Sequence, residues 1–480
     1  MQEKFLNLLI LSLIFLSSSG SAESLVEFLA TVKKSNLSWQ STELDVEAAF
    51  LKKQQATLMY TPELFATGRW GIDEKQSSFP GLEYDAIKSQ NYSLGIKQDF
   101  AFGLNTKLYY AYDYMAYEKV TGFNSDIKVH DARPVVELSL PLWGGAFGSS
   151  LRARHEMTLL RADAEAYAAQ SQKDQILTQA EFTYWRLSIA REALKIQEKA
   201  LKQSESILLY VSRRAGMNLG EEADKLQAKT LVEAKRFEVK QAQNEVRAAS
   251  RAYNKLRNVD LVAAIGDLEA VDFESLAKFQ LPTQRQNDRS DVKASEAQIA
   301  MSRQSAIIER ENNKPNLEIF GSYAINGRSD DNRGDAYSDS LDSGRSTTAV
   351  GLRFSMPLHI KASYDVRQAA YLNMQAAEIR LKEKKIAQNH DWQELIELLS
   401  EAQESLRLAK AIESAQQAKL LSERSRLKTG RTSTFQILQF EQEFTASEFN
   451  SVKLAAQILM LQAQLKLYDV SHDGKRDDLK

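Results

Sequence analysis

The chain has 480 residues, a formal net charge of −2 and no cysteine. Balanced charge argues against a nucleic-acid partner, because a basic face is the electrostatic footprint of that activity. Without cysteine no disulfide can form, so packing alone must hold the fold. The sequence has no Gly-rich phosphate loop, no nucleophile elbow and no histidines at metal-ligand spacing. We therefore expect no enzyme activity, no cofactor and no metal site.

The N-terminus has the pattern of a secretory signal peptide, which we place at residues 1–22. Lys4 supplies the positive start, Leu6 to Leu16 the apolar core, and Gly20-Ser21-Ala22 the small-residue cleavage site. The apolar run is shorter than the ~20 residues that a membrane-spanning helix needs. We therefore expect a secreted chain rather than an anchored one.

A helical stretch from Ser24 to Tyr60 ends at Thr61-Pro62, and the apolar period then changes to two. Alternating, aromatic-rich runs over residues 63–142 predict strands. Their connections are long, short and long: two polar loops, Asp73–Gln90 and Glu118–Arg133, lie on either side of a tight turn at Gly103. Short turns on one side and long loops on the other are typical of outer-membrane barrels, so we prefer a barrel to a soluble sandwich.

The longest regular segment, residues 149–258, contains no proline and only two glycines. Its residues favour helix, and leucine recurs every seventh position in the manner of a coiled coil at Leu187, Leu194, Leu201 and Leu208. A glycine-rich reversal at residues 213–220 divides the segment. We predict two long antiparallel helices, the first of roughly 100 Å at ~1.5 Å per residue.

The same order then returns, which predicts an internal duplication. Ser355-Met356-Pro357-Leu358 repeats Ser139-Leu140-Pro141-Leu142, and Gly430 is the counterpart of Gly216. The predicted organisation is a signal peptide, a first repeat, an equatorial linker, a second repeat and a C-terminal tail. Their bounds are residues 1–22, 23–258 (strands 63–142, helical hairpin 149–258), 259–288, 289–467 (strands 315–358, helical hairpin 359–467) and 468–480.

The strands and the hairpins both need partners. Membrane strands must close into a barrel, because an open edge in hydrocarbon leaves backbone groups unsatisfied. The chain offers six candidate strands, fewer than the eight of the smallest single-chain barrels. Several copies sharing one barrel would solve this. The alternative is a secreted coiled-coil structural or adhesive protein, in which the alternating runs form a soluble β domain.

The helix ends carry a resemblance to the TolC family of outer-membrane efflux proteins. The second reversal, residues 424–439, is similar to the family's tip pattern of a glycine, a short polar run and a new helix. The first reversal is similar too, with Gly216 followed by Asp224-Lys225-Leu226. The joint Leu140-Pro141-Leu142-Trp143-Gly144-Gly145 resembles the family's strand-to-helix joint. The order, duplication and spacing of these motifs cover essentially the whole chain.

The resemblance implies an α+β membrane protein: a homotrimeric outer-membrane β-barrel continued by a long α-helical coiled-coil tunnel across the periplasm. It implies a passive exit duct for efflux or type I secretion. The implied partners are a periplasmic adaptor, an inner-membrane transporter and outer-membrane lipid, with no nucleic acid. Family members usually give four strands per subunit. The hairpin Tyr92–Tyr117 would make six or would fold outside the wall, and the sequence leaves this open, as it does the cargo.

The resemblance also implies where the functional residues lie. Adaptor docking falls on the tips, at Gly216, Leu219, Gly220, Gly430, Thr432, Ser433 and Thr434, and the tip glycines are also expected to be helix C-caps with positive φ. The pore-constriction candidates are Asp224, Arg431, Gln436 and Gln439. Gln436 and Gln439 stand where the family often carries acidic residues, so an acidic ring is missing from that repeat.

Overall fold

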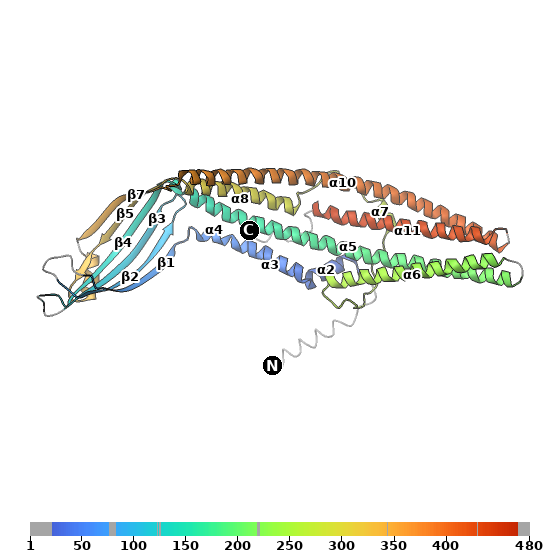
Figure 1. Ribbon diagram of the computed structural model, residues 1–480, viewed down its shortest axis with the longest axis horizontal. Coiled ribbons are helices and arrows are strands. Elements are labelled where there is room, and N and C mark those ends of the chain that lie inside the picture. The colour runs from blue at the N-terminus through green and yellow to red at the C-terminus, as the bar shows by residue number, and fades with distance from the viewer. Residues whose placement is uncertain are drawn as a thin grey trace, which may run out of the picture. The chain divides into compact units, whose positions relative to one another are not determined.

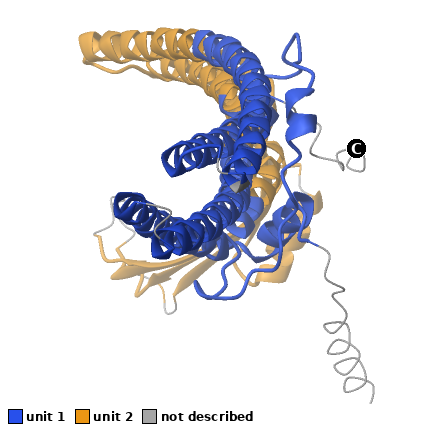
Figure 2. Cartoon of the chain, turned by 90° about the vertical axis from the view of Figure 1, so that its right-hand side faces the viewer, with its two compact units in different colours: residues 1–45, 168–291, 385–480 blue, residues 46–167, 292–384 orange. Residues whose placement is uncertain are grey.

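The computed structural model describes residues 22–75, 83–121, 123, 126–217, 221–342, 344–429 and 431–468. The predicted signal peptide, apart from Ala22, and the predicted tail, apart from Tyr468, lie outside these residues. The chain forms two compact units, which Figure 2 distinguishes by colour. Unit 1 comprises residues 1–45, 168–291 and 385–480, and unit 2 comprises residues 46–167 and 292–384.

Unit 1 is helical, and its long helices lie along an arc (Figure 2). Two helices of nearly equal length, α5 and α10, run through it from unit 2 and turn back as α6 and α11 (Figure 1). Its helices are α2 (Leu25–Ser35), the first part of α3 (Leu37–Lys52), most of α5 (Ser149–Gly216), α6 (Glu222–Leu256), α7 (Phe273–Ala277), the start of α8 (Ser290–Asn312), the second half of α10 (Ile360–Lys428), α11 (Thr434–Leu465) and the 3-10 turn η2 (Lys466–Tyr468).

Glu23, the first residue after the predicted cleavage site, is fixed to the segment that we predicted as a linker. Its N–H donates to Asp267 O (2.8 Å), and its carbonyl accepts from Glu269 N–H (3.2 Å). The Tyr184 hydroxyl donates to the same carbonyl at 2.7 Å, and burial raises the pKa of Tyr184 to about 12. Tyr184 packs on Phe28 and Tyr253 in a fully buried aromatic cluster. The N-terminal segment is therefore part of the core of unit 1.

Unit 2 carries one antiparallel sheet. Its strands are β1 (Glu63–Asp73), β2 (Ala86–Asp99), β3 (Asn105–Glu118), β4 (Ile127–Trp143), β5 (Asn316–Ile325), β6 (Gly327–Ser329) and β7 (Ser346–Ser355). The strand order is β1-β2-β3-β4-β5-β7, and the short β6 pairs with β4. The helical part of unit 2 is the end of α3, the short α4 (Gln54–Leu58), the 3-10 turn η1 (Ala146–Gly148), the short α9 (Arg333–Asp342), and parts of α5, α8 and α10.

The sheet answers the question that the sequence left open. β2 and β3 pair with each other over their full length, and they also pair with β1 and β4 on either side. The hairpin therefore lies within the sheet, which has six long strands. Both predicted polar loops are shorter than expected, because β2 already begins at Ala86 and β4 at Ile127.

The turn between β2 and β3 is fixed to the start of α5 by two glycines. Gly103 has φ +92° and Gly148 has φ +74°. A Cβ on Gly103 would lie 2.4 Å from the backbone nitrogen of Gly148, so only glycine permits this contact. Arg152 of α5 donates to the carbonyls of Ala101 (2.8 Å) and Phe147 (2.6 Å). The inserted hairpin is thereby tied to the helix that follows the sheet.

A short helix lies within residues 327–345, a stretch rich in glycine, aspartate and serine where the sequence predicts no helix. Helix α9 (Arg333–Asp342) begins after Asn332, whose side-chain oxygen accepts from Asp335 N–H at 3.0 Å. It packs against β4 and β6 through buried Ala336 and Ser340. The prediction missed this helix because its serine, aspartate and glycine content is that of a loop. Tertiary packing against the sheet decides its conformation instead.

Gly327 makes the packing of α9 possible, and its replacement by valine should undo it. A Cβ there would lie 2.0 Å from Ala336 O and 2.3 Å from Ser340 N, both backbone atoms that cannot move aside. We expect Gly327→Val to displace α9 and to destabilise unit 2 by about 1–3 kcal/mol. Gly344→Val, where no atom approaches within 4 Å, is the control. Faster proteolysis within residues 330–345 in Gly327→Val alone would confirm the prediction, and equal protection would contradict it.

A two-faced sheet and the helix tips as candidate functional site

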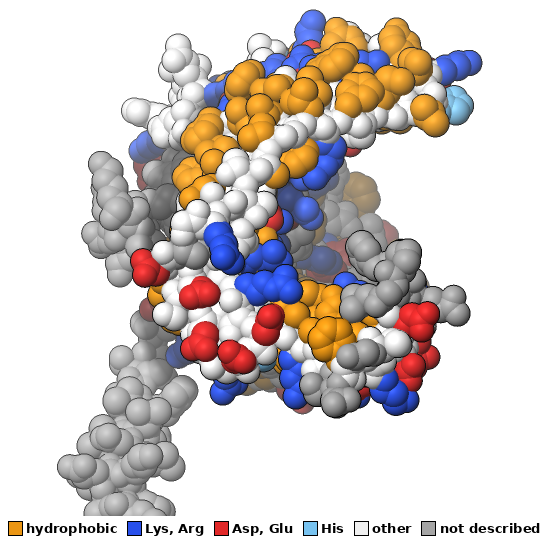
Figure 3. Space-filling view, turned by 90° about the vertical axis from the view of Figure 1, so that its left-hand side faces the viewer, with side chains coloured by type: hydrophobic (Ala, Val, Ile, Leu, Met, Phe, Trp, Pro, Cys, Tyr) orange, Lys and Arg blue, Asp and Glu red, His pale blue; other side chains and the backbone are white. Residues whose placement is uncertain are grey.

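One face of the sheet is apolar, and it is exposed except where α9 covers it beside Tyr110. Directly paired residues share a face, so the register defines rows of neighbours across the strands. One such row is Leu64–Ile96–Leu108–Val136–Tyr323, and another includes Leu140–Ile319–Leu352. The exposed members of this face include Leu64, Leu94, Leu108, Ile319, Val350, Leu352 and Phe354, and Val350 is 75 % exposed. Figure 3 shows hydrophobic side chains gathered in patches on the side that it views, with charged side chains between them.

The height of the apolar face matches a bilayer. On β4 the face extends from Leu140 to His130, a separation of ten residues, and α9 covers the part around the buried Ala132. At ~3.3 Å per residue and a tilt of about 40° this projects to about 25 Å, the height of the apolar band of membrane barrels. An aromatic row lies at its His130 end, where the Trp70 Nε1–H donates to the Tyr92 hydroxyl (2.9 Å) and Tyr112 bonds His130 (2.7 Å). The aromatic residues Phe102, Trp143 and Phe147 are exposed near the other end.

The five tyrosines of β3 are divided between the two faces of the sheet. Tyr110, Tyr112 and Tyr114 lie on the apolar face, in register with Leu94, Tyr92 and Gln90 of β2. Tyr109 and Tyr117 alternate to the opposite face, as a period of two requires. Tyr109 donates there to Glu137 at 2.7 Å. The sequence shows that these tyrosines are close together along the chain. The alternation of side chains along β3 decides which face of the sheet each one lies on.

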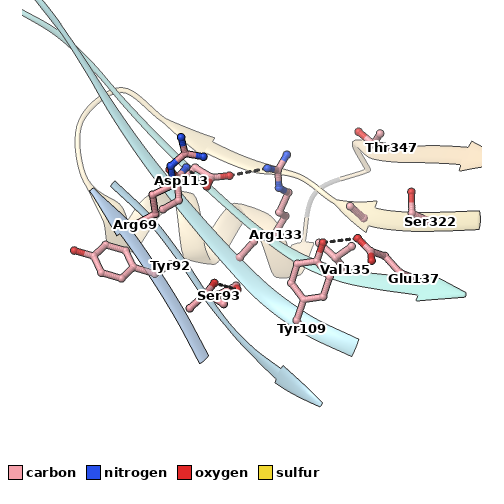
Figure 4. A pocket seen from close by; sticks show the side chains of 14 residues that line it. Arg69, Tyr92, Ser93, Tyr109, Asp113, Arg133, Val135, Glu137, Ser322 and Thr347 are labelled. Atoms are coloured by element: carbon pink, nitrogen blue, oxygen red, sulfur yellow. Dashed lines mark hydrogen bonds and ion pairs between the residues drawn. The ribbon is translucent and has the colours of Figure 1, made fainter. Parts of the chain in front are cut away.

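The opposite face of the sheet is polar and hollowed, with a cavity of about 560 Å³ (Figure 4). At its centre Asp113 accepts from Asn91 Nδ2 and from Arg133 NH2, each at 2.6 Å. The Thr67 and Ser93 hydroxyls share a hydrogen bond of 2.6 Å, and Lys97 forms an ion pair with Glu63 at 3.0 Å. These side chains satisfy one another across four strands. The face is therefore built to contact water.

The two edges of the sheet are its third feature. β1 pairs only with β2 and β7 only with β5 in the described part of the chain, so the outer backbone groups of β1 and β7 have no ladder partner there. Both edge strands are exposed along nearly their whole length. A long, exposed, apolar edge is a template for pairing with another chain.

The helix ends on either side of the two reversals come together in unit 1. Both helical reversals contribute to one apolar cluster, which contains Val211 of α5, Leu231 of α6, Leu427 of α10 and Ile437 of α11. Gly216 is the last residue of α5. The predicted site residues Leu219, Gly220 and Gly430 lie outside the described residues. Asp224 is in the first turn of α6.

The second tip has a defined cap. Ser433 is the N-cap of α11 and accepts from Gln436 N–H at 3.2 Å, while Thr434 is its buried first residue. Thr432 donates weakly to Gln436, and Gln439 donates to Glu443 at 2.9 Å. The Arg431 N–H bonds Arg426 O at 2.9 Å, the bond pattern of a Schellman helix end. Gln436 and Gln439 are exposed.

The expectation of a positive φ at Gly216 was wrong. Positive φ in the described residues is confined to other glycines and to Lys119, Phe147 and Asn258. Gly216 stays helical because the reversal occurs after it, where Met217 N–H bonds Arg214 O at 3.2 Å in a 3-10-type turn. A Cβ on Gly216 would meet no atom within 4 Å. Its conformation therefore does not require glycine.

Sequence reasoning missed two contacts that hold the tip together. Arg424 of α10 donates through Nε to Glu441 of α11 at 2.8 Å, and Glu441 is buried. The Tyr210 hydroxyl of α5 donates to the carbonyl of Leu427 in α10 at 3.2 Å, which links one hairpin to the other. The residues of the first pair are 17 positions apart in the sequence and those of the second pair 217, so no local sequence pattern indicates either contact.

Glu311, which is buried in unit 2, anchors the joint between sheet and helix. Burial alone would raise the pKa of Glu311, but hydrogen bonds from Lys314, Arg310 and the Gly145 N–H lower it below its ordinary value. A lowered pKa in the folded state stabilises the fold above the unfolded pKa, and this contribution is lost as the pH falls through the folded pKa.

We therefore expect the unfolding temperature of the wild-type chain to fall as the pH drops below about 4.5, the unfolded pKa. Glu311→Gln should be less stable at pH 7 and should lose less of its stability on acidification. Thermal unfolding followed by circular dichroism at pH 7 and at pH 3.5 measures both. Glu404→Gln, at an exposed helix pair with Arg407, is the control. Equal acid sensitivity of Glu311→Gln and the wild type would contradict this role.

No helix within the described ranges is long and apolar enough to cross a membrane. The described His, Asp and Glu side chains form no group of three that would hold a metal ion.

The chain joins a two-faced sheet with open edges to two very long helical hairpins. Solved structures of outer-membrane channels share this fold. The chain is 14 % identical to the outer-membrane protein VceC from Vibrio cholerae, with a TM-score of 0.65, covering 92 % of this chain and 95 % of that one. It is 16 % identical to the outer-membrane channel OprN (TM-score 0.64, 92 % and 89 % covered) and 13 % identical to CusC (TM-score 0.64, 95 % and 95 %).

No protein-family model matches the chain, and no curated protein matches it by sequence. The fold that the resemblance implied is confirmed, because the chain has the fold of the TolC-family outer-membrane channels.

Proposed function

We propose that the chain is the outer-membrane channel of an efflux or type I secretion system, a passive exit duct. The observation that carries the proposal is the sheet with one exposed apolar face, one polar face and two unpaired edges. A soluble β domain would leave its apolar face in water. The alternative of a secreted structural or adhesive protein is therefore disfavoured.

Three copies related by a three-fold axis would join β1 of one copy to β7 of the next. Six long strands per copy then give a barrel of eighteen. At ~4.8 Å between strands and a tilt near 40°, the barrel backbone would be about 35 Å across. The polar face would line the bore and the apolar face would meet lipid. The near-equal lengths of α5 and α10, 68 and 69 residues, support an internal duplication.

Exposed apolar side chains on the helices of unit 2 support the same assembly. α10 exposes apolar side chains in unit 2, among them Ile360, Leu372 and Ile379. α3 exposes Phe50 and Leu51 in the same unit. Isolated hairpins of this length would leave such surfaces uncovered, whereas copies packed around an axis would bury them. The bore would continue as a helical tunnel through the periplasm.

The tips would meet the partners. Docking of a periplasmic adaptor, linked to an inner-membrane transporter, is proposed at Gly216, Leu219, Gly220, Gly430 and residues 432–434. Asp224, Arg431, Gln436 and Gln439 remain the candidates for the constriction. Because Gln436 and Gln439 are uncharged, this ring would not concentrate cations. The Arg424–Glu441 and Tyr210–Leu427 contacts would hold the tip closed at rest.

Disulfide cross-linking tests the assembly directly, because the chain contains no cysteine. A panel of double variants with one cysteine on β1 and one on β7 should form covalent species of three chain masses in outer-membrane fractions. A cysteine pair at Ser93 and Ala111, which are paired on β2 and β3, should cross-link only within one chain. A mature chain that remains a monomer in the soluble fraction would refute the proposal.

A further inference from the structure

A groove of about 540 Å³ lies between α8 and α10 within unit 2, away from the sheet and from the tips. Its lining is mainly apolar: Ala306 and Ile307 on α8, and Tyr364, Tyr371 and Met374 on α10. The two tyrosines are 59 % and 48 % exposed, so their rings are available to a ligand. Ligand sites are typically apolar hollows of this size with a few polar groups that fix orientation.

Three guanidinium groups accompany this apolar lining. Arg303 is paired with Glu378 at 2.9 Å, and Arg310 is paired with Glu311 at 3.0 Å. Arg367 differs from both. Its Nε donates to the carbonyl of Ser363 at 3.2 Å, and no acidic side chain lies within 4 Å of it in the residues that the structure describes. Arg367 therefore lines the groove with terminal nitrogens that have no ion-pair partner among the described residues.

The apolar lining and the Arg367 guanidinium together indicate the kind of ligand that the groove would bind. A flat apolar body can stack on Tyr364, Tyr371 and the guanidinium planes, which bind aromatic faces well. A carboxylate or sulfonate on that body can take two parallel hydrogen bonds from Arg367, because a guanidinium presents donors in a fixed fork. A cation of the same shape would be repelled by Arg367, which has no acidic partner among the described residues.

We propose that the groove between α8 and α10 binds an amphiphilic organic anion, with its acidic group at Arg367 and its apolar body against Tyr364, Tyr371 and Met374. The site is a property of the chain itself, and binding there is measured without reference to export. Failure of this proposal would leave the proposed duct untouched, and a failure of the cross-linking test would leave this one standing.

Two dyes with the same three-ring skeleton and opposite charge test the proposal: fluorescein, an anion, and rhodamine 123, a cation. Fluorescence anisotropy is followed as the full-length mature chain, purified in an uncharged detergent, is titrated into each dye, with detergent alone as the blank. Saturable binding of fluorescein and at least tenfold weaker binding of rhodamine 123 are expected.

Substitutions then locate the site. Arg367→Gln should weaken fluorescein binding by about 10-fold or more, the usual effect of losing a charge-assisted bond. The fluorescein affinity of Arg367→Lys should lie between those of the wild type and Arg367→Gln, because lysine keeps the positive charge but cannot donate two parallel hydrogen bonds. Tyr371→Ala should also weaken fluorescein binding, and it serves as the second variant if Arg367→Gln does not fold. Arg380→Gln, an exposed α10 arginine outside the groove lining, should bind as the wild type does.

Two results would overturn the proposal. One is absence of saturable fluorescein binding to the wild type, which would mean that a second copy of the chain or a neighbouring side chain fills the groove. The other is fluorescein binding that is unchanged in both Arg367→Gln and Tyr371→Ala while circular dichroism shows native helix content.

Discussion

Replacing Leu94 by arginine should strongly reduce the amount of folded, membrane-inserted protein. Leu94 lies on β2, is 58 % exposed and points to the apolar face of the sheet. If that face meets lipid, an arginine near mid-height costs about 2–4 kcal/mol. Three copies in one barrel would multiply the effect. The measurement is the fraction of heat-modifiable oligomer on unboiled gels of outer-membrane fractions, together with the denaturation midpoint of the refolded protein in lipid.

The adjacent residue provides a matched control. Ser93 precedes Leu94 on the same strand, but it faces the polar hollow and bonds Thr67. Ser93→Arg should fold nearly as well as the wild type, because the arginine would point into a water-filled bore. Equal tolerance of both substitutions would mean that neither face meets lipid, and the alternative of a soluble β domain would then regain support. Loss in Leu94→Arg would also show that the β2–β3 hairpin belongs to the wall.

The sequence was sufficient to predict the two-faced strands and the long hairpins, because both follow from local periodicity. Alternation over β1 and β3 and the leucine repeat in α5 are properties of single segments. The number of strands in the sheet was not predictable, since it depends on which strands pair. That pairing is fixed by contacts such as Gly103 against Gly148, which are 45 residues apart and have no signal in a sequence window.

At the candidate site, too, the sequence predicted the features that have local signals and missed those that depend on contacts between distant segments. The glycines and the Ser433 cap could be located from residue types, because helix ends have local signals. The Gly216 φ was mispredicted, since a C-cap pattern does not state at which residue the chain turns. The α9 helix was missed because its stability comes from packing on Gly327 and Tyr110, whose hydroxyl bonds Ser340 at 2.6 Å. Arg424 and Glu441 meet only when α10 and α11 are folded against each other.

The second large effect is expected at the tip, from Arg424→Ala. Glu441 is buried, and without Arg424 its Oε1, which accepts two bonds from that arginine, would lose its partner. A buried charged acceptor left without its donor costs about 1–3 kcal/mol or more. The cost falls on the packing of α11 against α10 beside the predicted constriction. We therefore expect the tip to open more often, seen as a higher single-channel conductance of the purified protein in planar bilayers.

A second substitution, which removes the charge of Glu441, tests whether the effect of Arg424→Ala comes from an uncompensated charge or from a general loss of stability. Glu441→Gln in the Arg424→Ala background removes the uncompensated charge, and it should restore part of the closed-state conductance. Arg407→Ala breaks an exposed pair with Glu404 on the same helix α10 and should leave conductance unchanged, because exposed pairs contribute little. If Arg424→Ala left conductance at the wild-type level with an intact oligomer, the Arg424–Glu441 pair would hold the hairpin together without holding the channel closed. If the double variant conducted as strongly as Arg424→Ala alone, the effect would come from lost side-chain packing rather than from the charge of Glu441.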